Sequence, residues 1–440
     1  MNSYWQPDIE TAAPDTLRAM QLQALRRTLA QAAQSPYYGE LFRRLNFSPE
    51  QIRTRDDLRR LPFTTKDDLR GHFPYGFLAV PKAETIRLHC SSGTTGNPTV
   101  IFHNRHDLDS WANLVARSMY CAGARPDDVF QNICGYGLFT GGLGFQYGAE
   151  RLGALTIPAG AGNSRRQIKL MQEFGTTVIH AIPSYLPRLR EVFTELGLAP
   201  AKDTRLRVIL SGAEPYTEET RRRLEAMFAP AKVFNSFGLT EMNGPGVAFE
   251  CDCQNGLHVW EDAYLTEIVN PDTLEPVPDG ELGELVFTSL DRQAMPILRY
   301  RTRDLTRFLT GPCPCGRTHR RLDRITGRSD DMFIIKGCNV FPMQIEQVLM
   351  RIPQAASDYL IVLETLGDND ELILQVEAHP EWFNGDFSKL EHVRQRIVRE
   401  IHDEVLVTPI VQLVEPGSLP RAEGKAKRVD DRRRNGKTDF

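Results

Sequence analysis

The sequence has few cysteines, little excess charge and no long apolar run, and each shortage excludes a class of protein. Eight cysteines in 440 residues are too few for a disulfide-rich secreted scaffold. Lys and Arg number 53 against 57 Asp and Glu, which argues against a dedicated nucleic-acid binder. No apolar stretch approaches about 18 residues, so we expect no membrane span.

The N-terminal sequence does not show the pattern of a signal peptide. Residues 1–8 contain neither a basic region nor an apolar stretch. We therefore expect a cytoplasmic protein whose partners include neither nucleic acid nor a membrane. The length suggests two or three domains and is sufficient to bury a large core.

The apolar pattern changes twice along the chain. The first 80 residues predict helices, with Asp15 or Thr16 capping the first long one. From about 85 to 245, short apolar runs such as 178–182 and 206–210 alternate with amphipathic stretches. This alternation predicts an α/β fold with mostly parallel sheets and helices on both faces.

Two further segments follow this α/β region. Residues of about 250–328 alternate and are broken by Pro and Gly, which predicts a β-rich subdomain. After about 330 the pattern predicts a small α+β module. We therefore predict a large N-terminal domain over 1–329 and a small C-terminal domain over 330–440.

A dense run of hydroxyl groups and glycines occupies residues 91–99. Glycines let the backbone approach a ligand, and hydroxyl groups can donate to phosphate oxygens. The run is not a Walker loop, because no Lys follows Gly96. Taken alone, a hydroxyl-rich loop is more typical of a polar surface turn, although this run is unusually dense.

Together with later segments, this run resembles the adenylate-forming ligase superfamily of acyl-CoA synthetases, adenylation domains and luciferases. The further matching segments, in the same order along the chain, are 212–215, 237–241, 300–304, 327–331 and 424–425. Within the superfamily the chain resembles the phenylacetate–CoA ligase family. The strings that carry this closer resemblance are 135–142, 148–153, 327–332 and 419–426.

The resemblance implies a two-step reaction. An aryl carboxylate such as phenylacetate attacks the α-phosphate of ATP, giving an acyl-adenylate and pyrophosphate, and the thiol of CoA then displaces AMP. ATP, Mg²⁺ and CoA are the implied cofactors. The implied ATP-binding residues are Ser91, Ser92, Gly93, Thr94, Thr95, Gly96, Ala213, Glu214, Pro215, Phe237, Gly238, Thr240, Asp304 and Arg328.

The family resemblance also implies individual roles. Glu241 would hold Mg²⁺ and Thr240 would contact the α-phosphate. Asp304 would accept hydrogen bonds from the ribose hydroxyls. Lys425 would offset charge on the carboxylate and α-phosphate, with Lys427 as the competing candidate.

Acid binding and domain movement involve other residues of the matching strings. Tyr136 and Phe139, with Gly212 and Ala213, would line the pocket for the acid. Asp330 resembles the hinge about which the small domain rotates, and Gly337 would leave room for the pantetheine arm of CoA.

Two close cysteine pairs add a candidate metal site. Cys251-x-Cys253 with His258, and Cys313-x-Cys315, offer one ligand more than a structural zinc needs. Metal-free reduced thiols are the alternative. By resemblance to zinc-holding family members, the expected ligands are Cys251, His258, Cys313 and Cys315.

Several functions share this set of residues. The leading hypothesis is an aryl-acid–CoA ligase. The alternatives are an aryl-acid AMP ligase that loads a carrier protein, an adenylyl transferase like coenzyme F390 synthetase, and a nucleotide-binding regulatory protein. Assembly as a homodimer is left open.

Overall fold

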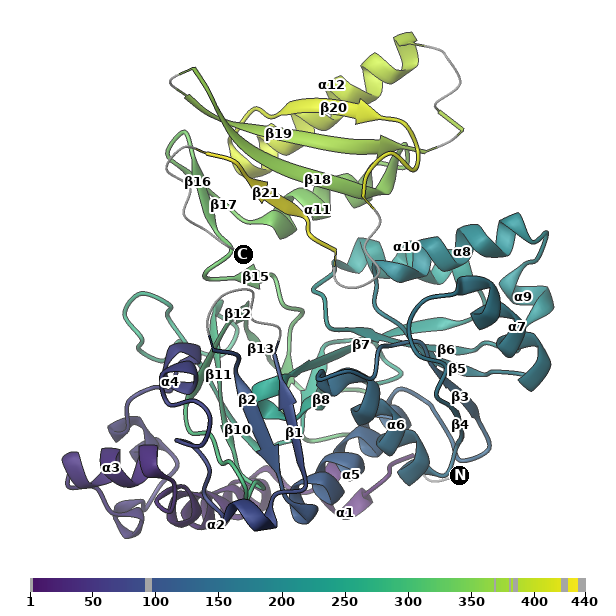
Figure 1. Cartoon of the computed structure of the whole chain (residues 1–440). Coiled ribbons are helices and arrows are strands. Elements are labelled where there is room, and N and C mark those ends of the chain that lie inside the picture. Colours follow the sequence, from purple (N-terminus) through teal and green to yellow (C-terminus); the bar gives the residue numbers. More distant parts are fainter. Residues whose placement is uncertain are drawn as a thin grey trace.

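The structure is a computed structural model and describes residues 3–91, 97–367, 369–379, 381–382, 387–420 and 426–433. Figure 1 shows a large N-terminal unit (residues 3–328) below a smaller C-terminal unit (residues 333–433). Among the described residues, no helix combines the length and apolar character needed to cross a membrane.

The N-terminal unit begins with helices, as predicted. They are α1 (Pro7–Glu10), α2 (Pro14–Ala32), α3 (Pro36–Arg44) and α4 (Lys66–Gly71), with 3-10 turns η1 (Pro49–Gln51), η2 (Asp56–Arg60) and η3 (Lys82–Glu84). The predicted cap of α2 by Asp15 or Thr16 is wrong: α2 starts one residue before Asp15, because a proline fits the first helical position. Thr65 caps α4 with a reciprocal Asp68 bond.

A nine-stranded sheet forms the centre of the N-terminal unit. Its order is β13-β14-β9-β8-β7-β6-β5-β3-β4, and the half from β7 to β4 is parallel. The strands are β3 (Val129–Asn132), β4 (Leu155–Ile157), β5 (Val178–His180), β6 (Val208–Gly212), β7 (Lys232–Leu239), β8 (Gly244–Glu250), β9 (Leu257–Val259), β13 (Phe308–Leu309) and β14 (Arg321–Leu322).

Helices cover both faces of the parallel half, which confirms the predicted fold class. They are α5 (Arg105–Cys121), α6 (Thr140–Leu152), α7 (Ser164–Phe174), α8 (Tyr185–Glu195), α9 (Pro200–Asp203) and α10 (Glu218–Phe228). Successive strand residues face opposite sides, so Val208 and Leu210 join the cluster with α5 and α6. Ile209 joins the cluster with α8 and α10 on the other side.

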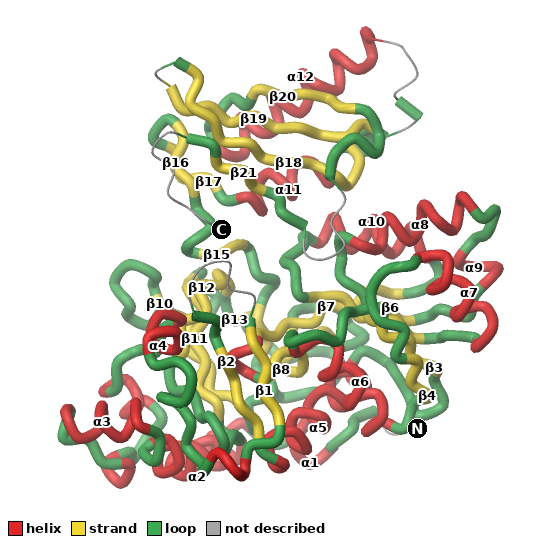
Figure 2. The backbone as a smooth tube through the Cα atoms, viewed as in Figure 1, coloured by secondary structure: helices red, strands yellow, loops and turns green. Residues whose placement is uncertain are grey.

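A second sheet, of four strands, lies beside the nine-stranded sheet; strands are yellow in Figure 2. Its strands are β10 (Tyr264–Val269), β11 (Gly283–Ser289), β12 (Tyr300–Thr306) and β15 (Gly327–Arg328), and a separate hairpin joins β1 (Arg87–Cys90) to β2 (Val100–His103). All of β11 is buried, unlike the alternating pattern predicted there. Its Glu284 is buried because Arg301 pairs with it.

The C-terminal unit has its own core. Its elements are β16 (Phe333–Ile335), β17 (Cys338–Val340), α11 (Pro342–Arg351), β18 (Ala355–Leu366), β19 (Asn369–Ala378), α12 (Phe387–Val405), β20 (Ile410–Val414) and β21 (Val429–Asp431). One face of the β20-β19-β18-β21 sheet packs on α11 and α12 in a single apolar cluster. That cluster contains no described residue before Phe333.

Candidate active site

Several predicted site residues, Gly212 to Pro215 among them, lie at or just after the ends of the parallel strands. Asn132, His180 and Gly212 are the last residues of β3, β5 and β6, which are neighbours in the sheet. Ligands bind at the carboxyl ends of strands in open α/β sheets because helix N-termini and loops converge there. A Cβ on Gly212 would meet the carbonyl oxygen of Ser236 at 2.0 Å, so only glycine fits this close approach.

The turn after β6 holds Ala213, Glu214 and Pro215. Ala213 has a φ of 69°, a left-handed conformation that is costly for a residue with a side chain. The Glu214 carboxylate accepts hydrogen bonds from the backbone N–H and hydroxyl of Ser184 at 3.1 and 3.0 Å. It also accepts one from the Ala426 N–H at 2.7 Å, so this carboxylate joins the two units.

Phe237 and Gly238 lie at the end of β7, opposite β8. The Phe237 ring stacks on Phe287 with centroids 6.1 Å apart and leaves part of its surface exposed. A Cβ on Gly238 would lie 1.9 Å from the carbonyl oxygen of Gly244. The strand crossing therefore requires glycine here and leaves the Phe237 ring as an aromatic wall.

Thr240 and Glu241 lie in the short 3-10 helix η4 (Thr240–Met242), which connects β7 to β8. The buried Arg292 donates from Nη1 to the Glu241 carbonyl oxygen at 2.6 Å. Burial, together with the adjacent Glu241 carboxylate, raises the pKa of Tyr300. Glu241 is thus held between a cation and a phenol that remains protonated.

Asp304 and Arg328 face each other across the β12–β15 pair. Arg328 Nη1 lies 3.3 Å from the Asp304 carboxylate, and Arg328 Nε lies 2.9 Å from that of Asp330. Burial raises the pKa of Asp304 to about 7, although Arg328 opposes the shift. The predicted hinge residue Asp330 is therefore tied to the predicted ribose site through one guanidinium.

Tyr136 and Phe139, predicted to line the acid pocket, follow β3. Asn132 donates from Nδ2 to the Tyr136 hydroxyl at 3.0 Å, and His180 Nδ1 donates to Asn132 Oδ1 at 3.1 Å. His180 Nε2 is then the acceptor facing the Cys134 thiol at 3.8 Å. Phe139 is about half exposed.

This hydrogen-bonded chain is neutral. Burial lowers the pKa of His180 to about 3 and raises the pKa of both Cys134 and Tyr136 to about 12. Because Asn132 already donates to the Tyr136 oxygen, the hydroxyl hydrogen of Tyr136 is free for an acceptor other than Asn132, His180 or Cys134.

Some predicted residues are not brought into view. Ser92, Gly93, Thr94, Thr95, Gly96 and Lys425 lie outside the described residues. Ser91 lies just before that stretch and donates its N–H to the Thr99 carbonyl at 3.0 Å. Gly337 occupies the β16–β17 turn with a φ of 81° and open space around its Cβ position.

The four predicted metal ligands come together at the end of β8. One ligand atom from each of Cys251, His258, Cys313 and Cys315 lies within 4.8 Å of the other three. The Cys251 and Cys313 sulfurs are 3.7 Å apart, against about 3.8 Å expected between two thiolates on a tetrahedral zinc. Cys253 is exposed and hydrogen-bonds Asp252, so it stays outside the set.

The histidine of this cluster is oriented for coordination. His258 Nδ1 donates to the His319 carbonyl at 3.1 Å, so Nε2 carries the lone pair and faces the Cys315 sulfur at 3.3 Å. Hydrogen bonding from Cys251, aided by His258, lowers the pKa of the Cys315 thiol. The donor set and its spacing fit a structural zinc.

The loop carrying Cys313 and Cys315 is fixed by the start of the chain. Tyr4 donates its hydroxyl to the Cys315 carbonyl at 2.9 Å, and the buried Glu10 pairs with Arg317 at 2.7 Å. Sequence reasoning missed this contact, because nothing in either segment indicates a partner about 300 residues away.

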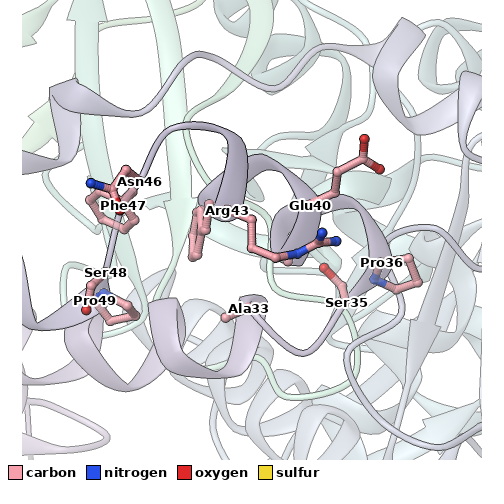
Figure 3. A pocket seen from close by; sticks show the side chains of 11 residues that line it. Ala33, Ser35, Pro36, Glu40, Arg43, Asn46, Phe47, Ser48 and Pro49 are labelled. Atoms are coloured by element: carbon pink, nitrogen blue, oxygen red, sulfur yellow. The ribbon is translucent and has the colours of Figure 1, made fainter.

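A surface hollow elsewhere does not belong to this site. It measures about 670 Å³ and lies among α2, α3 and η1, where Figure 3 labels Arg43, Glu40 and Phe47 on its lining. None of the predicted site residues lines it. Sequence reasoning also missed Arg292, Asn132 and His180. The last two are the final residues of β3 and β5, and His180 lies within the predicted apolar run 178–182, which is the one signal that the sequence offered for it.

Comparisons with known proteins identify the family of this chain. Residues 63–291 match the family model of AMP-binding enzymes, and residues 337–433 match that of the AMP-binding enzyme C-terminal domain. Phenylacetate–coenzyme A ligase of Thermus thermophilus is 44% identical, over 98% of this chain and 100% of its own length. The enzyme of that name from Escherichia coli K12 is also 44% identical, over 97% of each chain.

Solved structures extend the likeness to the whole chain. A crystal structure of 2-hydroxyisobutyryl-CoA ligase in the postadenylation state superposes with a TM-score of 0.91 and 31% identity, over 98% of this chain and 92% of the other. The same enzyme in the thioesterification state, with CoA, gives 0.73 at 32% identity, over 98% and 93%. The chain belongs to the phenylacetate–CoA ligase family of AMP-binding enzymes.

Proposed function

We propose that this protein activates an aryl carboxylic acid, with phenylacetate as the first candidate, and transfers the acyl group to CoA. The predicted enzyme class, an AMP-forming acid–thiol ligase, is confirmed by the family membership. The single observation that carries the proposal is the grouping of Phe237, Glu241 and the Asp304–Arg328 pair around Tyr300. Phe237 stacks on Phe287, which pairs with Tyr300, and the charges of Glu241, Asp304 and Arg328 all act on the Tyr300 phenol.

Each half-reaction uses this arrangement differently. In adenylation, the acid's carboxylate oxygen attacks the α-phosphate and pyrophosphate leaves, so groups that neutralise phosphate charge accelerate the step. Glu241 would hold Mg²⁺ through its carboxylate, Thr240 would donate to the α-phosphate, and Asp304 would accept from the ribose hydroxyls. In the second step the CoA sulfur attacks the acyl carbon and AMP leaves.

The acid pocket proposed around Tyr136 is supported by its hydrogen-bond chain. Asn132 fixes the phenol, and the aromatic ring offers an apolar face to an aryl group. Gly212 and Ala213, at the end of the nearby strand β6, would add a stretch of the pocket wall without bulky side chains.

Zinc bound by Cys251, His258, Cys313 and Cys315 would have a structural role, since all four positions are filled by protein. It would link the end of β8, the strand that follows Glu241, to the loop between β13 and β14. That loop follows β12, the strand that carries Asp304.

A carrier protein instead of CoA is the second candidate for the thiol acceptor. CoA is favoured because the relatives that cover almost this whole chain are named as CoA ligases. Acyl transfer to a phosphopantetheinylated carrier rather than to CoA would favour the alternative. The cytoplasmic location and the homodimer remain predictions.

The test is ATP–pyrophosphate exchange over a panel of aryl acids, followed by detection of the acyl-CoA. We expect exchange with phenylacetate or a close relative and an acyl-CoA product when CoA is added. The matched control is Glu241→Gln, which keeps the side-chain shape and should lose exchange. Absence of exchange with every aryl acid would contradict the proposal.

A further inference from the structure

Two helices from different units meet end to side beside the candidate site. They are α10 of the N-terminal unit and α11 of the C-terminal unit, which lie next to each other in Figure 1. The contact consists of polar groups at helix ends, which are normally left without intrahelical partners.

Arg223 of α10 caps the C-terminal end of α11. Its guanidinium donates to the carbonyl oxygens of Ala355 at 3.0 Å, Ile352 at 2.8 Å and Leu349 at 3.4 Å. Leu349 is in the last turn of α11 and Ile352 is its C-cap. A cation here satisfies free carbonyls and opposes the negative end of the helix dipole.

Glu346 of α11 makes the reciprocal contact at the N-terminal end of α10. Its carboxylate accepts from the Thr220 hydroxyl at 2.9 Å and lies 3.5 Å from the N–H of Thr217, the N-cap of α10. Tyr359 donates to its other oxygen at 2.9 Å. Each unit thus supplies the charged cap for a helix of the other, an arrangement we call the cross-cap.

A third contact links the cross-cap to the predicted catalytic lysine. Glu214, four residues before Glu218 at the start of α10, accepts from the N–H of Ala426 at 2.7 Å. Ala426 directly follows Lys425 in the sequence. Glu214 therefore holds Ala426, the residue after Lys425, against the N-terminal unit, on the same side as the cross-cap helix α10.

We propose that Arg223, Glu346 and Glu214 are positioning residues that keep the C-terminal unit in the arrangement used for adenylation. The likeness to the postadenylation state, at a TM-score of 0.91 against 0.73 for the thioesterification state, supports this assignment. Rotation of the unit for the second step must break all three contacts. The cross-cap therefore sets the balance between the half-reactions, an inference that rests on the proposed function.

The test removes one side of the cross-cap and measures each half-reaction separately. In Arg223→Met we expect ATP–pyrophosphate exchange to fall about tenfold, as for the loss of a charge-assisted hydrogen bond. Conversion of a supplied acyl-adenylate and CoA to acyl-CoA should be unchanged or faster. Glu346→Gln, altered on the other side, should shift the ratio of the two rates in the same direction.

Arg222→Met is the matched control. Arg222 neighbours Arg223 on α10, is exposed, and pairs with Glu218 of its own helix. Both rates should equal those of the unmodified protein. Equal loss of both half-reactions in Arg223→Met, or no loss of exchange, would overturn the inference.

Small-angle X-ray scattering of the unliganded proteins measures how the two units are arranged and does not require catalysis. We expect Arg223→Met to scatter as a broader distribution of arrangements than either the unmodified protein or Arg222→Met. Identical scattering from all three would overturn the inference even if no aryl acid were activated. Failure of the proposed function would instead appear as an unmodified protein without exchange.

Discussion

At the residue scale, the environment of Asp304 decides how it can bind a nucleotide. Burial raises its pKa to about 7, so the carboxyl group is partly protonated near neutral pH. An ionised carboxylate accepts hydrogen bonds from two neighbouring hydroxyls, whereas a protonated group must give up one acceptor. ATP binding should therefore depend on this one proton.

We predict that the KM for ATP rises as the pH falls through about 7, because Asp304 gains its proton. Asp304→Asn should raise the KM about tenfold and remove this pH dependence. Exchange rates measured against ATP concentration on both sides of neutrality test this prediction. Asp279→Asn, in an exposed pair with Arg320, is the control and should keep the dependence. Persistence of the dependence in Asp304→Asn would reject the role.

Gly238 is the second residue whose surroundings make a sharp prediction. An alanine Cβ at this position would lie 1.9 Å from the Gly244 carbonyl oxygen, a backbone atom that cannot move aside as the end of a side chain could. Gly238→Ala should lower the free energy of unfolding by about 2 kcal/mol and weaken exchange by displacing Thr240 and Glu241. Gly71→Ala, with open space around its Cβ position, should leave both unchanged. Denaturant unfolding and exchange assays measure the two effects.

At the element scale, the loop between β13 and β14 is held from two sides. The cysteine–histidine cluster fixes one part, and the N-terminal segment around Glu10 fixes the other through Arg317. Removing one partner of a buried ion pair is costly, because the remaining charge stays buried. The loop is thus built to be rigid.

Cys313→Ser should abolish zinc binding and lower the free energy of unfolding by roughly 3 kcal/mol. Cys253→Ser should do neither, because its exposed thiol lies outside the ligand set. Elemental analysis under reducing conditions, with thermal unfolding, tests both variants. Unmodified protein purified without stoichiometric zinc, or equal metal loss in Cys253→Ser, would contradict the assignment.

At the scale of the whole molecule, we propose a boundary near Asp330. The last buried residue of the N-terminal apolar cluster is Leu322, with the partly buried Ile325 packed against it, and the C-terminal core begins at Phe333. The segment between them contains Arg328, which bonds Asp304 on one side and Asp330 on the other. Rotation of the C-terminal unit at Asp330 would therefore change the contact between Arg328 and Asp304 at the predicted ribose site.

Lys425→Ala should slow adenylation about a hundredfold, as for removal of one group that stabilises transition-state charge. Thiolation of a supplied adenylate should change little, because the C-terminal unit has then rotated away. Lys427→Ala is the control, since that side chain is mostly exposed and pairs with Asp430 at 3.6 Å. Equal loss in both half-reactions would reject the role of Lys425.

The sequence by itself determined the fold class and the family, and it located several of the strands and helices. These follow from local patterns: apolar periodicity marks each element, and motif strings such as 237–241 carry the chemistry in adjacent residues. The choice of Cys251, His258, Cys313 and Cys315 over Cys253 was also available, through the family resemblance.

Only the tertiary structure decided the contacts between distant residues. Arg292 under Glu241, Glu10 against Arg317, and the cross-cap of Arg223 and Glu346 each join segments that share no local pattern. The raised pKa of Asp304 likewise comes from its burial in the folded protein. Charge–charge interactions, the burial of a carboxyl group and the capping of a helix end all depend on residues that are close in space but distant in sequence. Their energies are therefore defined only once the chain is folded.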